Sequence, residues 1–281
     1  MQTFTNKVAV VTGAASGMGR GFAERFAREG MRVVLADVEE PVLDLAVNEL
    51  RDQGFEVIGI PTDVRHLDSV EHLARRTLDA FGAVHVVCNN AGVEGYLDGA
   101  IWEATDKDWQ WTFGVNFWGI VNGIRAFMPH MLEHGEEGHV VNTCSATALV
   151  TAGNMYGITK HASLALSETL YGQLKQRNAR IGVTALCPGV VNTRLFEGRR
   201  NRPEDLRNET EGPGMAQAAA MRRGWFERAA QSTQPAEVAD QLINAIRNGQ
   251  FYVVTDHLWD DRIQARADAI RNRTNPVTSN R

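Results

Sequence analysis

The chain has 281 residues, a hydrophobic fraction of 43% and a formal net charge of −5 at pH 7. This charge is modest and spread along the sequence, so no concentrated basic face indicates a nucleic-acid partner. No apolar stretch approaches the ~20 residues that a membrane-spanning helix needs, and no signal peptide precedes the first predicted strand. The three cysteines are too few for a disulfide framework. We therefore expect a soluble, cytoplasmic protein without a membrane partner.

Apolar runs of strand length alternate with amphipathic segments of helix length along the chain, which is typical of a parallel sheet covered on both faces. The predicted strands are residues 8–11, 32–36, 57–60, 84–88, 139–143, 181–186 and 251–254. The predicted helices are residues 18–30, 41–54, 67–81, 106–133, 155–177 and 236–247. The pattern predicts a three-layer, doubly wound α/β fold with a parallel sheet of about seven strands.

No internal repeat or linker divides the chain, so we expect residues 1–281 to form a single domain. Residues 194–233 break the alternation before the last helix and strand, and the polar tail at residues 272–281 is expected to be loose. Three arginines cluster in the irregular segment, and we expect them to lie in a solvated loop: Arg199, Arg200 and Arg202.

A glycine-rich segment follows the first strand and begins the first helix. Glycines at such a turn let the backbone approach a diphosphate, and the helix N-terminus offers free N–H groups to the anion. An ordinary tight turn is the weaker interpretation, because the segment opens a repeating βα pattern. The residues expected to contact the cofactor here are Gly13, Ser16, Gly17, Met18 and Gly19.

Asp37 ends the second strand about 20 residues beyond the glycines, where a carboxylate can bind the adenosine ribose hydroxyls of a dinucleotide. A carboxylate at that position would repel a 2′-phosphate. A solvated or helix-capping aspartate is the alternative interpretation.

The spacing T-G-x-x-x-G-x-G resembles the short-chain dehydrogenase/reductase family. Four further segments match that family in order, each at the carboxyl end of a predicted strand: Asp37, Asp63-Val64, Asn89-Asn90-Ala91-Gly92 and Pro188-Gly189-Val190-Val191-Asn192-Thr193. The resemblance covers roughly residues 5–255 and implies a Rossmann-type domain, homodimers or homotetramers, and NAD rather than NADP, because Ser16 and Val38 occupy positions that are basic in NADP-preferring members. It also implies cofactor contacts from Asp63, Val64, Asn90, Ala91, Gly92, Pro188, Gly189, Val191 and Thr193.

Tyr156 and Lys160 lie four residues apart near the start of a predicted helix, so their side chains share one face. This is the Y-x-x-x-K pattern of the family. The ordinary pKa of a tyrosine is about 10. The hydroxyl can exchange a proton with the reacting oxygen if a nearby ammonium and the nicotinamide cation lower that pKa. By resemblance both residues also contact the cofactor. A surface Tyr–Lys pair would have the same spacing.

Ser145 matches the family's substrate-orienting serine, whose hydroxyl would bond the reacting oxygen. Many members place this serine thirteen residues before the tyrosine, whereas the interval here is eleven. Thr143 has the usual interval but belongs to the predicted strand, so Ser145 and a shortened loop are preferred. Asn116, on an apolar stripe of the long helix, resembles the family asparagine that holds a water in a proton relay. A hydrogen-bonded core asparagine is the alternative.

The resemblance and these residues predict an NAD(H)-dependent oxidoreductase that interconverts a secondary alcohol and a ketone. The irregular segment stands where the family carries its substrate lid, and its apolar residues indicate a bulky aryl or alicyclic substrate. A 3-oxoacyl-thioester reductase that uses Arg199, Arg222 or Arg223, and a catalytically idle NAD-binding protein, remain alternatives. No metal site is expected, since the pair His130 and His134 lacks a third ligand. The apolar lid and pocket candidates are Met215, Met221, Trp225, Phe226 and Trp259.

Overall fold

The computed structural model describes residues 1–209, 218–220, 222–224 and 232–278. Within them, one sheet has all of its strands parallel, in the order β3-β2-β1-β4-β5-β6-β7. The strands are β1 Val8–Thr12, β2 Arg32–Asp37, β3 Val57–Pro61, β4 Val86–Asn89, β5 Gly138–Thr143, β6 Ile181–Cys187 and β7 Tyr252–Val254. The predicted three-layer, Rossmann-type α/β fold is confirmed.

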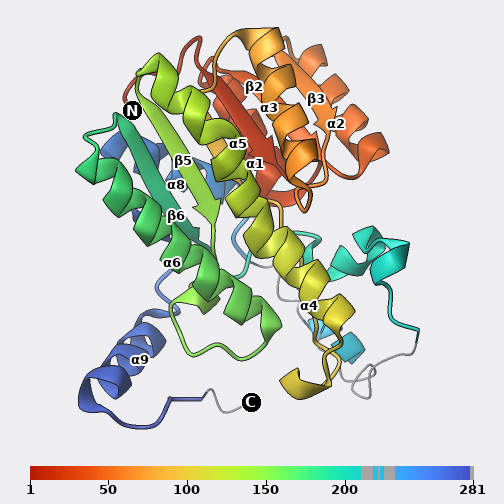
Figure 1. Cartoon of the computed structure of the whole chain (residues 1–281), viewed down its shortest axis with the longest axis vertical. Helices are drawn as coiled ribbons and strands as arrows, with labels where there is room; N and C mark the ends of the chain where they lie inside the picture. Colours follow the sequence, from red (N-terminus) through yellow and green to blue (C-terminus); the bar gives the residue numbers. More distant parts are fainter. Residues whose placement is uncertain (210–217, 221, 225–231, 279–281) are drawn as a thin grey trace.

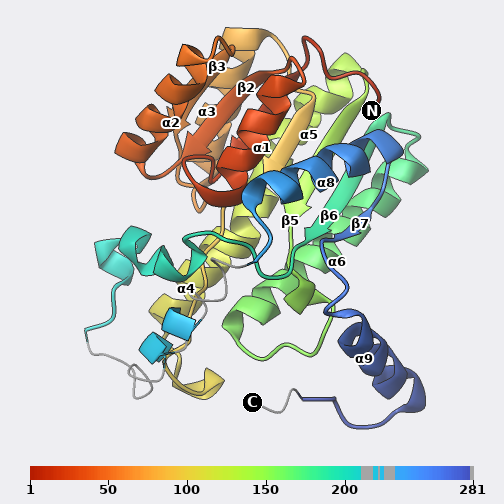
Figure 2. The same cartoon turned by 180° about the vertical axis from the view of Figure 1, so that it is seen from behind.

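Helices cover both faces of this sheet (Figures 1 and 2). Helices α3, α5 and α6 lie on the face turned toward the viewer in Figure 1, and α1, α2 and α8 lie on the face seen in Figure 2. The long helices are α1 Gly17–Arg28, α2 Glu40–Asp52, α3 Leu67–Phe81, α4 Asp106–Phe113, α5 Gly119–His134, α6 Met155–Gln176, α8 Pro235–Asn248 and α9 Asp260–Asn272. Short 3-10 turns are Ile101–Glu103, Ala146–Ala148, Leu195–Asn201 and Glu204–Leu206.

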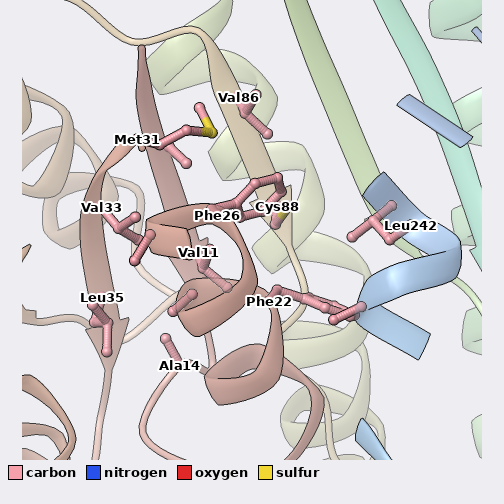
Figure 3. Close-up of a cluster of buried hydrophobic side chains, with 14 of the residues drawn as sticks. Val11, Ala14, Phe22, Phe26, Met31, Val33, Leu35, Val86, Cys88 and Leu242 are labelled. Carbon is pink, nitrogen blue, oxygen red and sulfur yellow. The ribbon is translucent and has the colours of Figure 1, made fainter. Parts of the chain in front are cut away.

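Two hydrophobic layers hold the helices to the sheet. On one face Phe22 and Phe26 of α1 pack with Val11, Leu35 and Leu242, as Figure 3 shows. On the other face, side chains of α3, α5 and α6 form the second layer. Every residue of β1 is buried, as expected of a central strand in a doubly covered parallel sheet. Cys88, Cys144 and Cys187 are buried free thiols, as their positions at the ends of apolar runs predict.

The predicted helix over residues 106–133 is wrong in one respect, because a π-helical turn at Gly114–Trp118 separates α4 from α5. Such turns occur mostly as single insertions and often at functional sites, and Asn116 lies inside this one. Helix α4 begins with a capping box, since Thr105 accepts from the Asp108 N–H and its own N–H donates to Asp108.

Two strand boundaries and one helix also differ from the prediction. The fourth strand begins at Val86 and the last at Tyr252, each one or two residues later than expected. Helix α9 was not predicted, because its only buried residue is Ala269 and it therefore carries no apolar stripe. In Figure 1 it stands beyond the carboxyl end of the sheet. It ends at Asn272, where the polar tail begins.

The close approach of α5 to β4 depends on a glycine. A Cβ atom at Gly123 would collide with the side chain of Asn89. We therefore expect Gly123→Ala to lower the free energy of unfolding by about 1–3 kcal/mol through overpacking. Gly172 of α6 is the matched control, because a Cβ there meets nothing within 4 Å. Gly172→Ala should stabilise the protein by roughly 0.5–1 kcal/mol, and urea unfolding monitored by circular dichroism measures both. Equal effects of the two substitutions would contradict this packing argument.

Candidate active site

The glycine-rich loop connects β1 to the N-terminus of α1 at the carboxyl edge of the sheet. Gly13 and Gly17 have φ angles of 66° and 55°, a left-handed backbone that other residues rarely adopt. Gly19 is needed for a different reason, because a Cβ there would collide with the carbonyl oxygen of Gly13. Helix α1 begins at Gly17, so its free N–H groups face the space above the loop. This cradle fits a dinucleotide diphosphate.

Asp37 lies beside this loop at the end of β2. Its carboxylate accepts from the N–H of Ala15 at 3.0 Å and from the N–H of Glu39 at 3.1 Å. Each oxygen atom keeps a further lone pair for a ligand hydroxyl. Glu39 adds a second carboxylate at the same place, and the adjoining Val38 side chain is half exposed. The arrangement fits an adenosine ribose.

Most of the predicted cofactor residues line one continuous cleft above the carboxyl edge. The exceptions are Gly19, which lies beneath the loop, and three residues after β6 that line a second cavity, Pro188, Gly189 and Val191. Those in the cleft are Gly13, Ser16, Gly17, Met18, Asp37, Val38, Asp63, Val64, Asn90, Ala91, Gly92, Tyr156, Lys160 and Thr193. The sequence motifs therefore predict most of the residues that line the cleft. They do not distinguish the three residues that line the second cavity instead.

The second cavity adjoins the cleft and has a largely apolar wall. The two spaces share Met18, Tyr156, Thr193 and Leu195. Trp259, which was expected either at the pocket or at a subunit contact, is one of the wall residues. The other residues that line only this cavity are Glu94, Leu97, Ser145, Thr147, Asn154, Pro188, Gly189, Val190, Val191 and Phe196. Tyr156 therefore lies where the cleft and the cavity meet.

Tyr156, Lys160 and Ser145 meet at this junction. Ser145 hydrogen-bonds the Tyr156 side chain, and the Lys160 ammonium lies 5.4 Å from the centroid of the Tyr156 ring. Lys160 also donates to the carbonyl oxygen of Thr143 at 2.7 Å. The Thr143 hydroxyl instead donates to Asn90 at 3.2 Å. The geometry therefore places Ser145, rather than Thr143, beside the tyrosine despite the shortened interval.

Burial sets the charge states of the pair in the protein alone. It raises the pKa of Tyr156 to about 12, and the hydrogen bond from Ser145 opposes this increase. It also lowers the pKa of Lys160 to about 8. The expected lowering of the Tyr156 pKa involves the nicotinamide cation as well as the ammonium, so it stays a prediction; in the chain alone, desolvation of the phenolate dominates.

Asn116 is fully buried, and its side-chain amide is satisfied. It accepts from the N–H of Val93 at 2.8 Å and donates to the carbonyl of Val93 at 2.9 Å and to Thr159 at 3.0 Å. Its main-chain carbonyl accepts from Ser163 at 3.2 Å. The side chain thus fastens the segment after β4 to α6. This is the core role that the sequence left open as an alternative, and the relay role stays a prediction.

Thr12 is a structural centre of the site that was not among the expected site residues. Its hydroxyl accepts from the N–H groups of Asn90 at 2.9 Å and Ala91 at 3.1 Å, and its carbonyl accepts from the Asn90 amide at 3.0 Å. The sequence did contain a signal for this role, because Thr12 belongs to the T-G-x-x-x-G-x-G motif. Its partner Asn90, directly after β4, is distant in the chain, so the contact could not be predicted. The bonds align the glycine-rich loop with the segment after β4.

The arginines of the irregular segment do not lie in a solvated loop, which corrects the expectation. Arg199 pairs with Asp98, and Arg200 pairs with Glu39 at 2.6 Å. Arg202 pairs with buried Asp108 at 2.7 Å and stacks over Trp111. These three ion pairs attach the start of the expected lid to three separate segments around the cleft.

Other predictions concern residues at the edge of the site. Met215, Met221, Trp225 and Phe226 lie outside the described residues. The described part of the chain contains no group of three or more potential metal ligands. His134 instead bonds the carbonyl of Val84 at 2.8 Å. No helix in the described ranges is long and apolar enough to span a membrane.

Comparison with known proteins agrees with this geometry. A family model described as short chain dehydrogenase matches residues 7–204. The chain belongs to the short-chain dehydrogenase family. Members of this family are oxidoreductases with a Rossmann fold.

Three members show the range of similarity. The 1-deoxy-11-beta-hydroxypentalenate dehydrogenase of Streptomyces arenae is 42% identical over 198 residues, which cover 68% of this chain and 70% of that protein. A short-chain dehydrogenase/reductase of Burkholderia phymatum, solved in complex with NAD, is 40% identical with a TM-score of 0.94, covering 100% of both chains. Actinorhodin polyketide ketoreductase, solved with NADPH, is 28% identical with a TM-score of 0.73, covering 91% of this chain and 97% of that one.

The burial of Lys160 predicts how the stability of this short-chain dehydrogenase depends on pH. Burial lowers the pKa of Lys160 to about 8 in the folded protein, against about 10.4 in an unfolded chain. Between these values the unfolded chain binds more protons, so stability rises with pH across that window, and the full penalty of burying the charge applies below it. Lys160→Met should therefore raise the free energy of unfolding of the cofactor-free protein by on the order of 2 kcal/mol near neutral pH.

The gain should shrink as the pH approaches about 10, and urea unfolding at two pH values measures it. Lys175→Met, at the exposed end of the same helix, is the control, with no comparable change. A destabilised Lys160→Met protein at both pH values would show that the hydrogen bond to Thr143 outweighs the cost of burial.

Proposed function

We propose that this protein is an NAD(H)-dependent oxidoreductase that interconverts a bulky, apolar secondary alcohol and the corresponding ketone. One observation carries the proposal: Tyr156 stands at the junction of the dinucleotide-shaped cleft and the apolar cavity, with Ser145 and Lys160 beside it. Proton transfer to or from an alcohol oxygen requires such a group at the border between cofactor and substrate.

A bound nicotinamide dinucleotide would supply the acceptor or donor of the hydride. In this proposal Gly13, Gly17 and the N-terminus of α1 hold its diphosphate, and Lys160 holds the nicotinamide ribose. The Tyr156 hydroxyl takes the proton of the alcohol during oxidation and returns it during reduction. Ser145 donates to the reacting oxygen and stabilises the charge that develops on it. Asn116 keeps the segment after β4 and helix α6 in register, and it holds the water of the proton relay.

The preference for NAD is part of the proposal. Asp37 and Glu39 line the end of the cleft where the adenosine ribose fits, and Arg200 there is already paired with Glu39. Two carboxylates favour ribose hydroxyls and disfavour the additional charge of a 2′-phosphate. The NAD complex of the Burkholderia relative supports the same choice.

The substrate class follows from the cavity wall. Leu97, Val190, Phe196 and Trp259 give it an apolar character, which favours an aryl or alicyclic group. The alternative of a 3-oxoacyl thioester bound through arginines loses support, because Arg199 and Arg222 face the carboxylates of Asp98 and Glu94. Closure of the segment over residues 194–233 would exclude water from the reaction.

The family also supplies the expected organisation of the protein. We propose that residues 1–281 form one domain that acts as a homodimer or homotetramer in the cytoplasm. The exposed side chains of Trp118 and Leu258, at 50% and 83%, leave apolar surface for contacts between subunits.

Substitution of the tyrosine tests the reaction. Tyr156→Phe should bind NADH with nearly unchanged affinity, because the ring remains, and should lose at least about two orders of magnitude in turnover, since the proton-transferring hydroxyl is gone. The assay follows NADH absorbance with a panel of aryl, alicyclic and steroidal alcohols and their ketones, and NADH fluorescence measures binding. Tyr171→Phe, on the same helix and away from the cavity, is the control. Unchanged turnover in Tyr156→Phe would refute the mechanism, and NADH binding without turnover in the wild type would support an idle binding protein.

Substitution of Asp37, at the end of β2, tests the proposed preference for NAD over NADP. Wild-type protein should use NAD at least about tenfold more efficiently than NADP, and Asp37→Asn should reduce this ratio by about tenfold, since one repulsive charge corresponds to roughly 1–2 kcal/mol at an intermediate dielectric constant. The ratio of kcat/KM for the two cofactors measures the effect. Asp44→Asn, on the outer surface of α2, is the control. A wild-type preference for NADP would overturn the assignment.

A further inference from the structure

A second group of charges lies beside the catalytic residues, and the proposed reaction does not use it. The segment after β4 carries Glu94 and Asp98, whose side chains are only 2% and 4% exposed. The irregular segment after β6 supplies two facing arginines. Arg199 pairs with Asp98, and Arg222 lies 3.6 Å from Glu94 and 3.5 Å from Asp98. Two arginines thus face two buried carboxylates.

Glu94 differs from Asp98 in its position, because it lines the apolar cavity that contains Tyr156 and Ser145, and Asp98 does not. Among the described lining residues it is the only carboxylate. Its side chain is held against the turn at Gly198, where a Cβ atom would collide with a carboxylate oxygen. It is therefore a fixed acidic group in a largely apolar wall.

The oxygen atoms of Glu94 are incompletely satisfied. Within the part of the chain that the structure describes, neither oxygen has a side-chain donor at hydrogen-bond distance: Arg222 approaches one of them only to 3.6 Å, and the other contacts of the carboxyl are with the backbone at Gly198 and at Glu94 itself. Burial raises the pKa of the Glu94 carboxyl, in spite of the positive charges of Arg222 and Arg199. A buried carboxylate whose donors are distant or poorly aligned is costly, whereas a ligand that supplies a well-placed donor reduces this cost.

We propose that Glu94 is a specificity-determining residue, and that the substrate carries a neutral hydroxyl group, remote from the reacting carbon, which donates to the Glu94 carboxylate. A hydroxyl fits better than a cation, because the two arginines already balance the two carboxylates. An acidic group would be repelled by Glu94. The inference rests on the proposed function and narrows its substrate class to hydroxylated aryl or alicyclic secondary alcohols.

Matched substrates test this inference. One pair is α-ethylbenzyl alcohol and the diol with a further hydroxyl on its terminal carbon, and a second pair is α-methylbenzyl alcohol and its para-hydroxy analogue. In at least one pair the wild type should oxidise the hydroxylated member with a kcat/KM at least about tenfold higher, which is the effect of one hydrogen bond to a charged group. Glu94→Leu should bring the ratio close to one by lowering kcat/KM more for the hydroxylated member than for the plain alcohol.

Two further variants make the result specific. Glu94→Gln preserves the shape but not the charge, so the ratio should fall by about threefold. It also serves if Glu94→Leu does not fold, as judged by circular dichroism and NADH binding. Asp98→Asn removes a charge from the same cluster without changing the cavity wall, and it should keep the wild-type ratio.

The outcomes separate this inference from the function on which it rests. Turnover without a preference in either pair, or a ratio that is unchanged in both Glu94 variants, would overturn the role of Glu94 alone. An equal decrease in Asp98→Asn would also overturn it, because the effect would then come from the cluster as a whole. Absence of turnover on every alcohol, with intact NADH binding, would overturn the proposed function itself.

Discussion

The active-site geometry depends on one chain of hydrogen bonds across the carboxyl ends of the central strands. Thr12 at the end of β1 accepts from the backbone of Asn90, Asn90 accepts from Thr143 at the end of β5, and the carbonyl of Thr143 accepts from Lys160 of α6. The glycine-rich loop, the segment after β4 and the proposed catalytic lysine are thereby fixed relative to each other. Parallel strands make this possible, because their carboxyl ends meet at one edge of the sheet.

The irregular segment after β6 is joined to this rigid edge by charges rather than by apolar packing alone. Three of its arginines, Arg202, Arg199 and Arg200, reach α4, the segment after β4 and the loop after β2 respectively. Removing one member of a buried pair is expensive, but replacing a whole pair by apolar residues often is not. Ion pairs therefore give specificity of position more than stability. That property suits a segment that borders both the cofactor cleft and the substrate cavity.

The proposed catalytic pair illustrates a conflict between stability and reactivity. Burial raises the pKa of Tyr156 to about 12 and lowers that of Lys160 to about 8. Both shifts oppose the charged forms that would stabilise the reacting oxygen. Binding of a cofactor with a positively charged ring would favour the phenolate. The hydrophobic layers on either side of the sheet stabilise the fold and so offset the free-energy cost of burying these groups.

The sequence by itself determined the order of strands and helices, the glycine cradle and the Tyr156–Lys160 pair, because each follows from local periodicity or from residues close together in the chain. Only the tertiary structure decided between Ser145 and Thr143, showed the π-helical turn around Asn116, and assigned partners to the arginines. Helix α9 lacked a sequence signal since it buries almost nothing. The arginine partners lie far away in the chain, and Glu94 acquires its chemistry only from the cavity that the fold builds around it. Long-range contacts of this kind depend on packing, which no local pattern encodes.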